Sequence, residues 1–280
     1  MATQDLLGEL VALWRYPVKS MMGEERNAAE ILRRGLLGDR AYAVIDVEEG
    51  RIASAKSPHK YRRLFDCRAA LLDEPAPGSP PPPVRITLPD GRELRSDRDD
   101  VDRALSELLG RAVRLIASAP ESPRLEEYWP DIEGLAHRDT FTDEAMPPGT
   151  FFDLATIHLL TTATLDALRR VEPAGRFEVR RFRPNLVVAT PGGEAGFVED
   201  GWIGRLLNLG GTVRLEVTGP CPRCVMTTLP QSDLPKDPGI LRAAVRHHGG
   251  HVGVYAAVVD GGEVCRGDRC SASPDGHEAG

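Results

Sequence analysis

The chain has 280 residues and a formal net charge of −7, which argues against general affinity for nucleic acid or for an anionic membrane. This length can bury a substantial core and favours two domains. The sequence holds no run of about 18 apolar residues, so no membrane span is expected. The acidic N-terminus lacks the basic start of a signal peptide, which predicts a cytoplasmic location. Five cysteines, an odd number, favour reduced thiols with separate roles over a disulfide framework.

Short strands are predicted in the first part of the chain, because β-branched and apolar residues recur there between turn signals. These predicted strands are 10–18, 41–47, 65–72 and 84–88. The segment 75–83 has six prolines in nine residues, so we expect a stiff, exposed loop within one domain. A short helix is predicted over 101–109, since aspartates precede it and Gly110 follows it.

The region 118–148 loses periodicity and is rich in Pro, Glu and Asp, which predicts the connection between two domains. A strand over 157–161 and an amphipathic helix over 162–171 follow. The later predicted strands are 186–190, 203–209, 212–218 and 252–259, with a hairpin from the last of these into Val264. Many short strands with few helices indicate a mainly β (α+β) fold that contains a closed or nearly closed barrel.

Residues 220–228 read Pro-Cys-Pro-Arg-Cys-Val-Met-Thr-Thr and follow a strand-like run. We therefore expect the thiol of Cys224 at a turn that leaves a strand, beside the guanidinium of Arg223. A cation lowers the pKa of a thiol by stabilising the thiolate, which is the form that ligates metals. The segment thus predicts that Cys224 binds the metal of a cofactor.

Three other interpretations of the cysteines stay open. Cys221 and Cys224 could form a zinc site with Cys265 and Cys270, although the second pair is loosely spaced. The first pair could instead be a thioredoxin-like redox motif, but such motifs open a helix and here strands surround the pair. Finally, both sulfurs could be small buried hydrophobic groups.

The segment 169–183 contains six arginines and only two glutamates. Such a run usually forms a basic surface that is exposed to solvent. Arg183, however, leads directly into an apolar strand, and guanidinium groups bind phosphate in a bidentate manner. Lys19 and Arg40, each near a strand end, could join Arg183 around one anion. Lysine is rare in this chain, so each lysine merits attention: Lys19, Lys56, Lys60 and Lys236. A phosphate-bearing small molecule is favoured over nucleic acid, because aromatic residues are only 5%. Three histidines are interpreted as surface residues of a Gly-rich loop: His247, His248 and His251.

Four segments taken together resemble the signature of MOSC-domain proteins, the molybdenum cofactor sulfurase C-terminal domain family. They are PVKS (17–20), GLLGDR (35–40), FRPN (182–185) and CPRCVMTT (221–228). The two-part layout is similar to the mitochondrial amidoxime-reducing component and its bacterial relatives. The resemblance implies a MOSC N-terminal β-barrel-like domain over 1–120, a MOSC β-barrel domain over 121–272 and a disordered tail over 273–280.

The resemblance also implies a molybdenum cofactor, molybdopterin with Mo, whose metal is bound by Cys224. Asp153, at the start of the second domain, is implied as a second catalytic residue, and His158 and Thr162 stand in the segment that follows it. The cofactor-binding residues that we expect are Lys19, Ser20, Arg40, Thr161, Arg183, Asn185 and Arg223.

The implied activity is that of a molybdenum-dependent oxidoreductase that reduces N-hydroxylated small molecules. We expect neither the N-terminal anchor of the mitochondrial members nor an appended iron–sulfur domain. Electrons would then come from a separate donor protein of the ferredoxin or flavin reductase type, with no nucleic acid or membrane as partner. Two alternatives stay open: a sulfur-carrier or cofactor-binding protein in which Cys224 bears a persulfide, and a specialised pathway enzyme on the same scaffold.

Overall fold

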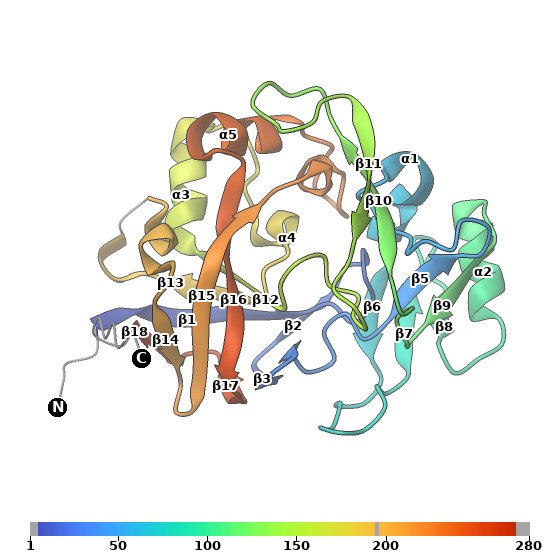
Figure 1. Cartoon of the computed structure of the whole chain (residues 1–280), viewed down its shortest axis with the longest axis horizontal. Coiled ribbons are helices and arrows are strands. Elements are labelled where there is room, and N and C mark those ends of the chain that lie inside the picture. The colour runs from blue at the N-terminus through green and yellow to red at the C-terminus, as the bar shows by residue number, and fades with distance from the viewer. Residues whose placement is uncertain (1–4, 194–195, 273–280) are drawn as a thin grey trace.

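A computed structural model describes residues 5–193 and 196–272, and it confirms a mainly β fold with a few helices (Figure 1). Seven strands of the described chain close into a barrel in the order β13-β12-β16-β15-β14-β18-β1, because β1 also pairs with β13. Their bounds are β1 (Asp5–Arg15), β12 (Ile157–Thr161), β13 (Leu186–Ala189), β14 (Leu206–Leu209), β15 (Val213–Pro222), β16 (His251–Asp260) and β18 (Arg269–Ala272).

The barrel is held together by an apolar interior. Leu10, Leu159, Leu186 and Leu215 are fully buried in one cluster that several strands share. Removal of apolar surface from water, worth about 25 cal/mol per Å², is the main favourable term in such a core. Strands β12 and β13 run parallel, and helix α3 (Thr162–Val171) connects them as a crossover. The predicted strand at 157–161 and helix at 162–171 are thus confirmed.

Strand β1 lies in the same barrel as strands far along the chain. It pairs antiparallel with β13 and with β18. At Gly8 an added Cβ would lie 2.2 Å from the carbonyl oxygen of Ala189, so only glycine allows this approach. Residues 5–15 therefore join the later strands, whatever boundary separates the two proposed domains near residue 120.

Five early strands form small sheets around a second apolar core that includes Val18, Val44, Leu64, Val84 and Leu105. They are β5 (Ala43–Asp46), β6 (Arg68–Leu71), β7 (Val84–Thr87), β8 (Glu93–Arg95) and β9 (Val113–Ile116). Three other early strands belong to the barrel side: β2 (Glu24–Arg26) pairs with β1, and β3 (Ala28–Leu32) and β4 (Gly35–Leu36) pair with each other and add Ile31 and Leu36 to the barrel core. Strands β6 and β7 pair on either side of the proline-rich loop, as expected. Helix α2 (Val101–Leu109) has the predicted bounds, and α1 (Pro58–Tyr61) is a single turn.

Two segments differ from the sequence-based expectation. The region 118–148 holds a regular hairpin of β10 (Arg124–Trp129) and β11 (Thr140–Ala145). Its charged residues hide the alternation, but the two strands satisfy each other's backbone groups. The glycine-rich loop expected near the histidines is largely helix α5 (Gly239–His248), which has His247 and His248 in its last turn.

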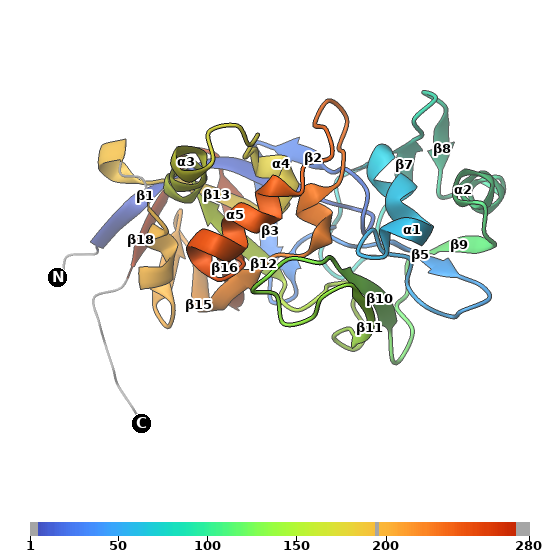
Figure 2. The same ribbon diagram turned by 90° about the horizontal axis from the view of Figure 1, so that it is seen from above.

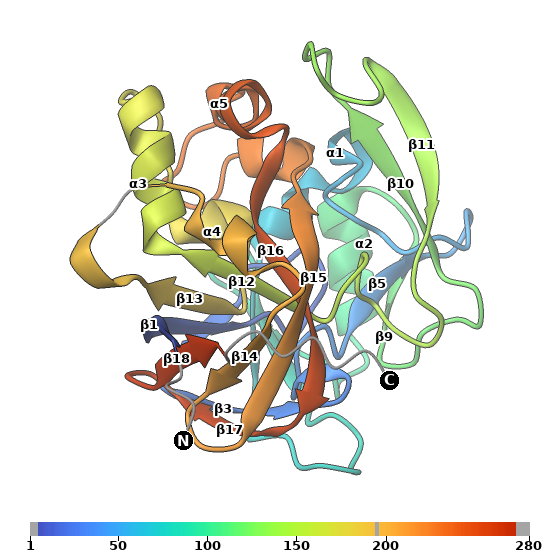
Figure 3. The ribbon, with the colours of Figure 1, turned by 60° about the vertical axis from the view of Figure 1, so that its left-hand side comes forward.

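The barrel and the sheets of β5–β9 occupy opposite ends of the molecule, with the β10–β11 hairpin between them (Figures 1 and 2). Helices α3 and α5 pack together beside the barrel through Leu165, Leu168 and Ile240, and the hairpin stands at another side (Figure 3). Two short elements complete the order, α4 (Val179–Phe182) and β17 (Gly262–Cys265). The expected tail at 273–280 lies outside the described residues. Within them, no helix has the length and apolar character needed to span a membrane.

Candidate functional site

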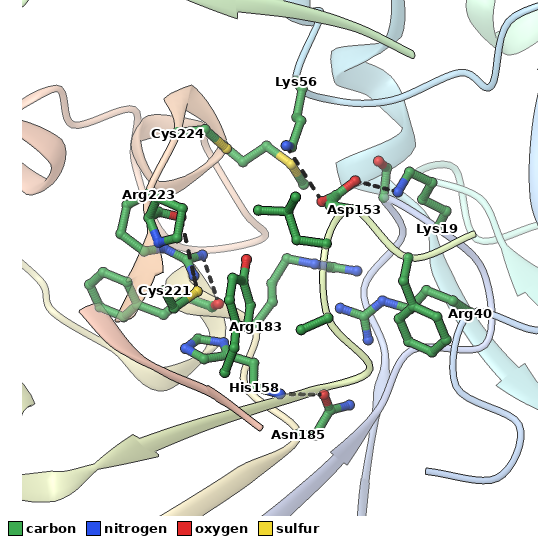
Figure 4. Close-up of a pocket in the computed structure, with 18 residues that line it drawn as sticks. Lys19, Arg40, Lys56, Asp153, His158, Arg183, Asn185, Cys221, Arg223 and Cys224 are labelled. Carbon is green, nitrogen blue, oxygen red and sulfur yellow. Dashed lines mark hydrogen bonds and ion pairs between the residues drawn. The ribbon is translucent and has the colours of Figure 1, made fainter. Parts of the chain in front are cut away.

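A pocket opens where the barrel meets the N-terminal strands, and it holds about 750 Å³ of space, part of it open to solvent (Figure 4). Its walls come from widely separated stretches of the chain. The predicted site residues that line it are Lys19, Ser20, Arg40, Asp153, Arg183, Asn185, Arg223 and Cys224. The structure therefore brings almost the whole predicted set to one place.

Thr161 is the exception among the predicted cofactor-binding residues. It is fully buried, its hydroxyl donates to the carboxylate of Glu199 at 2.6 Å, and it accepts from the backbone N–H of Thr164. Its side chain thus caps α3 instead of facing the pocket. Side chains alternate along a strand, and His158, three positions earlier on β12, takes the side that faces the pocket.

Two guanidinium groups lie against the ring of Tyr16, with Arg40 at 4.4 Å and Arg183 at 4.2 Å from its centroid. Arg40 is paired with Asp39 at 2.6 Å. Arg183 is only 7% exposed and donates to the carbonyl of Met21 at 2.8 Å, but no carboxylate of the described chain forms an ion pair with it. Burial, followed by repulsion from Arg40, lowers the pKa of Arg183 to about 10. A buried cation without a counter-ion favours an anionic ligand.

Backbone strain gathers at the same pocket. Ser20, Arg40 and Arg183 have φ values of 63°, 48° and 55°, in the left-handed region that non-glycine residues rarely adopt. Asp139 and Ser232 are the other two such residues in the described parts of the chain. Each of these conformations costs roughly 1–3 kcal/mol, and such residues cluster at functional sites. The strain therefore supports a binding role for this pocket.

Asp153 lies between two lysines. Lys19 Nζ donates to its Oδ1 at 2.5 Å, and Lys56 Nζ lies 3.7 Å from its Oδ2. Burial raises the pKa of Asp153, but Lys19 and Lys56 together hold it well below its usual range. The carboxyl group is therefore ionised at neutral pH, which suits it to position the two ammonium groups and not to donate a proton.

Arg223 donates a hydrogen bond to Cys221, whereas its charge also acts on Cys224 and lowers the pKa of that thiol against the larger effect of burial, as expected in direction from the sequence. Its Nη1 donates to Cys221 Sγ at 2.8 Å, and its Nη2 donates to the carbonyl of Phe182 at 2.8 Å. Burial opposes ionisation of Cys221, but Arg223 and then His158 lower its pKa to about 6. Residues 221 and 223 are two positions apart at an extended strand end, so their side chains share one side.

Cys224 begins the turn that follows β15 and lines the pocket as a half-buried free thiol. Burial raises its pKa to about 11, and Lys56 is the group that most opposes this rise. The sulfur is therefore free and directed into the basic pocket, but it is protonated at neutral pH. The sequence led us to expect that the Cys224 thiol would be ionised without a bound metal, and this expectation is wrong.

The zinc and thioredoxin-like interpretations of the cysteines find little support. The interpretation of both sulfurs as buried groups holds for Cys221 but not for Cys224, which is only half-buried. Cys270 is fully buried in the barrel interior, and among the described residues no group of three or more His, Cys, Asp or Glu could hold a metal. A zinc site of four cysteines is thus not formed. The Cys221–Cys224 pair precedes a short 3₁₀ turn over 225–228 instead of the helix of a thioredoxin-like motif. A metal on Cys224 would need its other ligands from a cofactor.

Four further pocket residues with polar or ionisable side chains were not in the predicted site set: Lys56, His158, Cys221 and Tyr255. The rarity of lysine was the one sequence signal that pointed to Lys56. His158 lies in the segment after Asp153, but the sequence of this segment did not show whether His158 or Thr161 points into the pocket. The Arg223–Cys221 contact depends on which way the strand end faces, which the motif alone does not reveal.

Asn185 lines the pocket but uses its amide to join segments. It donates to Asp39 at 2.9 Å and to the carbonyl of Trp14 at 3.3 Å, and it accepts from the backbone of His158 at 3.2 Å. We therefore interpret it as a residue that fixes the pocket walls, next to Arg40 and Arg183.

Residues 7–111 match the family described as the MOSC N-terminal beta barrel domain, and residues 148–271 match the MOSC domain. Mitochondrial amidoxime reducing component 2 of Rattus norvegicus is 27% identical over 235 residues, which is 80% of this chain and 67% of that protein. Molybdenum cofactor sulfurase of Homo sapiens is 25% identical over 252 residues, which is 78% of this chain but 26% of that protein. The solved structure of the YUAD protein from Bacillus subtilis has the same fold, with a TM-score of 0.50 at 13% identity, over 98% of this chain and 100% of that one.

Proposed function

The chain belongs to the MOSC-domain proteins, and from this premise we propose that it is a molybdenum-cofactor-dependent reductase of N-hydroxylated small molecules. The observation that carries the proposal is the free thiol of Cys224 in a pocket that also contains the buried, uncompensated Arg183. One soft sulfur ligand together with guanidinium groups suits a metal that arrives with an anionic organic ligand.

The residues divide by chemistry. Cys224 would ligate molybdenum, since a thiolate suits a soft site. Arg40 and Arg183 would bind the cofactor's phosphate, because guanidinium groups match its oxygens. When bound, the cofactor supplies the two-electron chemistry that breaks an N–O bond. Lys19 and Lys56, held by Asp153, would add fixed positive charge near the reaction.

The raised pKa of Cys224 has a consequence for loading. A thiol must lose its proton to ligate a metal, so cofactor binding should release a proton at neutral pH. The positive charges of Lys56 and Arg223 favour this loss. Asp153 stays ionised throughout, so the proton that reduction consumes would come from water or from another group. We propose that the electrons come from a separate donor protein.

The test is to purify the protein from a host that makes the cofactor, to measure molybdenum by elemental analysis, and to assay benzamidoxime with an artificial electron donor. We expect about one molybdenum per chain with turnover, and we expect Cys224→Ser to lose both while it keeps the thermal midpoint of the cofactor-free wild-type chain. Full molybdenum loading of the Cys224→Ser variant would overturn the ligand assignment. Loaded wild-type protein that does not cleave an N–O bond would overturn the reductase.

A sulfur-carrier role is the second candidate, favoured by the similarity to a molybdenum cofactor sulfurase. Cys224 would then bear a persulfide. Cyanide-labile sulfur in protein without molybdenum would support that role. The high pKa of this thiol works against it, because the thiolate is the nucleophile that forms such a bond.

A further inference from the structure

A second hollow lies beside the first pocket and holds about 860 Å³ of space, part of it open to solvent. It shares only Arg40 and Phe152 with the first pocket, and Cys224 does not line it. Its walls come from segments 32–41, 75–81, 117–119 and 149–152. We call it the proline-loop pocket, after the proline-rich loop that forms one of these walls. It is thus a separate site from the one proposed for the cofactor.

The proline-rich wall is held in place at both ends. The loop joins the paired strands β6 and β7 at the lower edge of the molecule (Figure 1). A Cβ added to Gly38 would lie 3.1 Å from Cγ of Pro75, so the loop packs closely on the turn that forms another wall. Near its other end, the hydroxyl of Tyr42 donates to the carbonyl of Pro82 at 3.0 Å. Proline also fixes the backbone angle φ, so this wall has little conformational freedom to lose when a ligand binds.

Most residues that line the proline-loop pocket are apolar. Pro75 and Pro81 lack a backbone N–H, so they offer ring carbons and carbonyl groups but no backbone donor. Leu36 and Phe151 are buried side chains of other walls. A mostly apolar hollow of roughly 300–1,000 Å³ with a few polar groups is the usual form of a small-molecule site. The polar groups then decide which ligand fits.

The pocket has one uncompensated charge, and this charge is positive. Three ionisable residues line it: Arg34, Asp39 and Arg40. Asp39 and Arg40 form an ion pair at 2.6 Å, and Asp39 also accepts from the side chain of Asn185 at 2.9 Å. Arg34 is exposed, and its guanidinium forms no ion pair or hydrogen bond with any residue that the structure describes. A free guanidinium favours an anion, and its planar shape matches a carboxylate.

No nearby acid cancels the charge of Arg34 from the proline-rich loop. Glu74 precedes Pro75, but it pairs with Arg15 and Arg26 and does not line the pocket. The first pocket is lined by five lysines and arginines and by one acid, which suits an anion of higher charge such as a phosphate. A single free guanidinium suits an anion of single charge.

We propose that the proline-loop pocket binds a monocarboxylate with an apolar body, with its carboxylate at Arg34 and its body between the proline-rich wall and the side chains of Leu36 and Phe151. This site needs no molybdenum, so it stands or fails separately from the proposed function. Because Arg40 lines both pockets, the ligand would lie next to a residue that we assign to the cofactor's phosphate.

Calorimetry with three probes that share a naphthalene body tests the proposal: naphthoate, naphthamide and naphthylmethylammonium. The full chain is used in phosphate buffer, so that inorganic phosphate occupies the basic first pocket. We expect naphthoate to bind at least about threefold more tightly than naphthamide, a modest factor because Arg34 is exposed to solvent. Naphthylmethylammonium should bind most weakly. Equal affinities for the three probes, or tightest binding of the ammonium probe, would overturn the proposal.

Arg34→Gln should remove the preference for naphthoate over naphthamide. Arg33→Gln is the matched control, because Arg33 lies in the same turn between β3 and β4 and is equally exposed, but it does not line the pocket. A preference that survives in Arg34→Gln, or that is lost equally in Arg33→Gln, would refute the role of Arg34.

A second variant tests where the apolar body lies. Ala117→Trp should fill the proline-loop pocket and abolish binding of naphthoate and naphthamide. Ser118→Trp, at the next exposed position outside the pocket, should leave both affinities unchanged. Both positions are exposed, so we expect both variants to keep the thermal midpoint of the wild type. Unchanged naphthoate affinity in Ala117→Trp would place the probe in another pocket and overturn the proposal.

Discussion

Cys221 and Cys224 are three residues apart, yet the structure gives their thiols opposite properties. Cys221 is 1% exposed and has its pKa lowered to about 6, although burial opposes this, because Arg223 donates to its sulfur. Cys224 lies at the pocket, and burial raises its pKa to about 11. The lesson is that the direction of a side chain, and not its distance in sequence from an arginine, decides which thiol ionises.

The contrast suits different tasks. The thiolate of Cys221 balances the charge of Arg223 inside the protein and thereby fixes the guanidinium next to the pocket. The protonated thiol of Cys224 is a weak nucleophile. Under the proposed function a metal would displace its proton, so a metal-free chain would keep this sulfur less reactive until the cofactor binds.

Removal of the Arg223 guanidinium should reduce the difference between the pKa values of Cys221 and Cys224 most strongly. In Arg223→Met, burial is left as the largest influence on Cys221, so its pKa should rise by at least about two units, equivalent to about 2.7 kcal/mol. The thiolate absorbance of metal-free protein near 240 nm measures this titration, with Cys221→Ser as the blank. A midpoint that stays near 6 would show that His158 and Tyr255 suffice.

The pH dependence of stability should sharpen the same comparison. The pKa of Cys221 is about 6 in the folded chain and about 8.5 in an unfolded one, so the unfolded state binds more protons between these values. The stability that the thiolate contributes is full above about pH 8.5 and is lost as the pH falls toward 6. Urea unfolding should show this loss in the wild type and not in Cys221→Ser. Parallel profiles of the two proteins would contradict it.

Local sequence patterns predicted many of the helices and strands. Helix α2 ends at Gly110, and α3 begins at the Thr161 cap, so both bounds follow from residues close in sequence. The motifs likewise placed Lys19, Arg40, Arg183 and Cys224 in one pocket. The helix bounds depend on residues that are close in sequence, and the pocket residues could be predicted because they belong to motifs that resemble those of one family.

Contacts that join distant segments were beyond the reach of these patterns. Nothing in strand β1 reveals that it closes the barrel by pairing with β13, about 175 positions later. The hairpin of β10 and β11 was not predicted because its strands are rich in charged residues. Lys56 was not predicted as a site residue because its ion pairs with Glu127 and Asp153, which are distant in sequence, hold it at the pocket. The partner of Arg223 depended on the orientation of a strand end.

The smallest effect concerns the cation beside Cys224. Lys56 is the group that most lowers the pKa of this thiol, and Glu127 raises it. In Lys56→Met the buried Glu127 loses its counter-charge and tends to protonate, so the two changes partly cancel. We therefore expect iodoacetamide to alkylate Cys224 of the metal-free chain only about threefold more slowly at pH 8.5, roughly half a pKa unit. Lys60→Met is the matched control, since Lys60 pairs with Glu49 and Glu126 outside the pocket, and Lys56→Arg should restore the rate. Equal alkylation rates in Lys56→Met and the wild type would show that Arg223, despite its hydrogen bond to Cys221, is the cation that controls the pKa of Cys224.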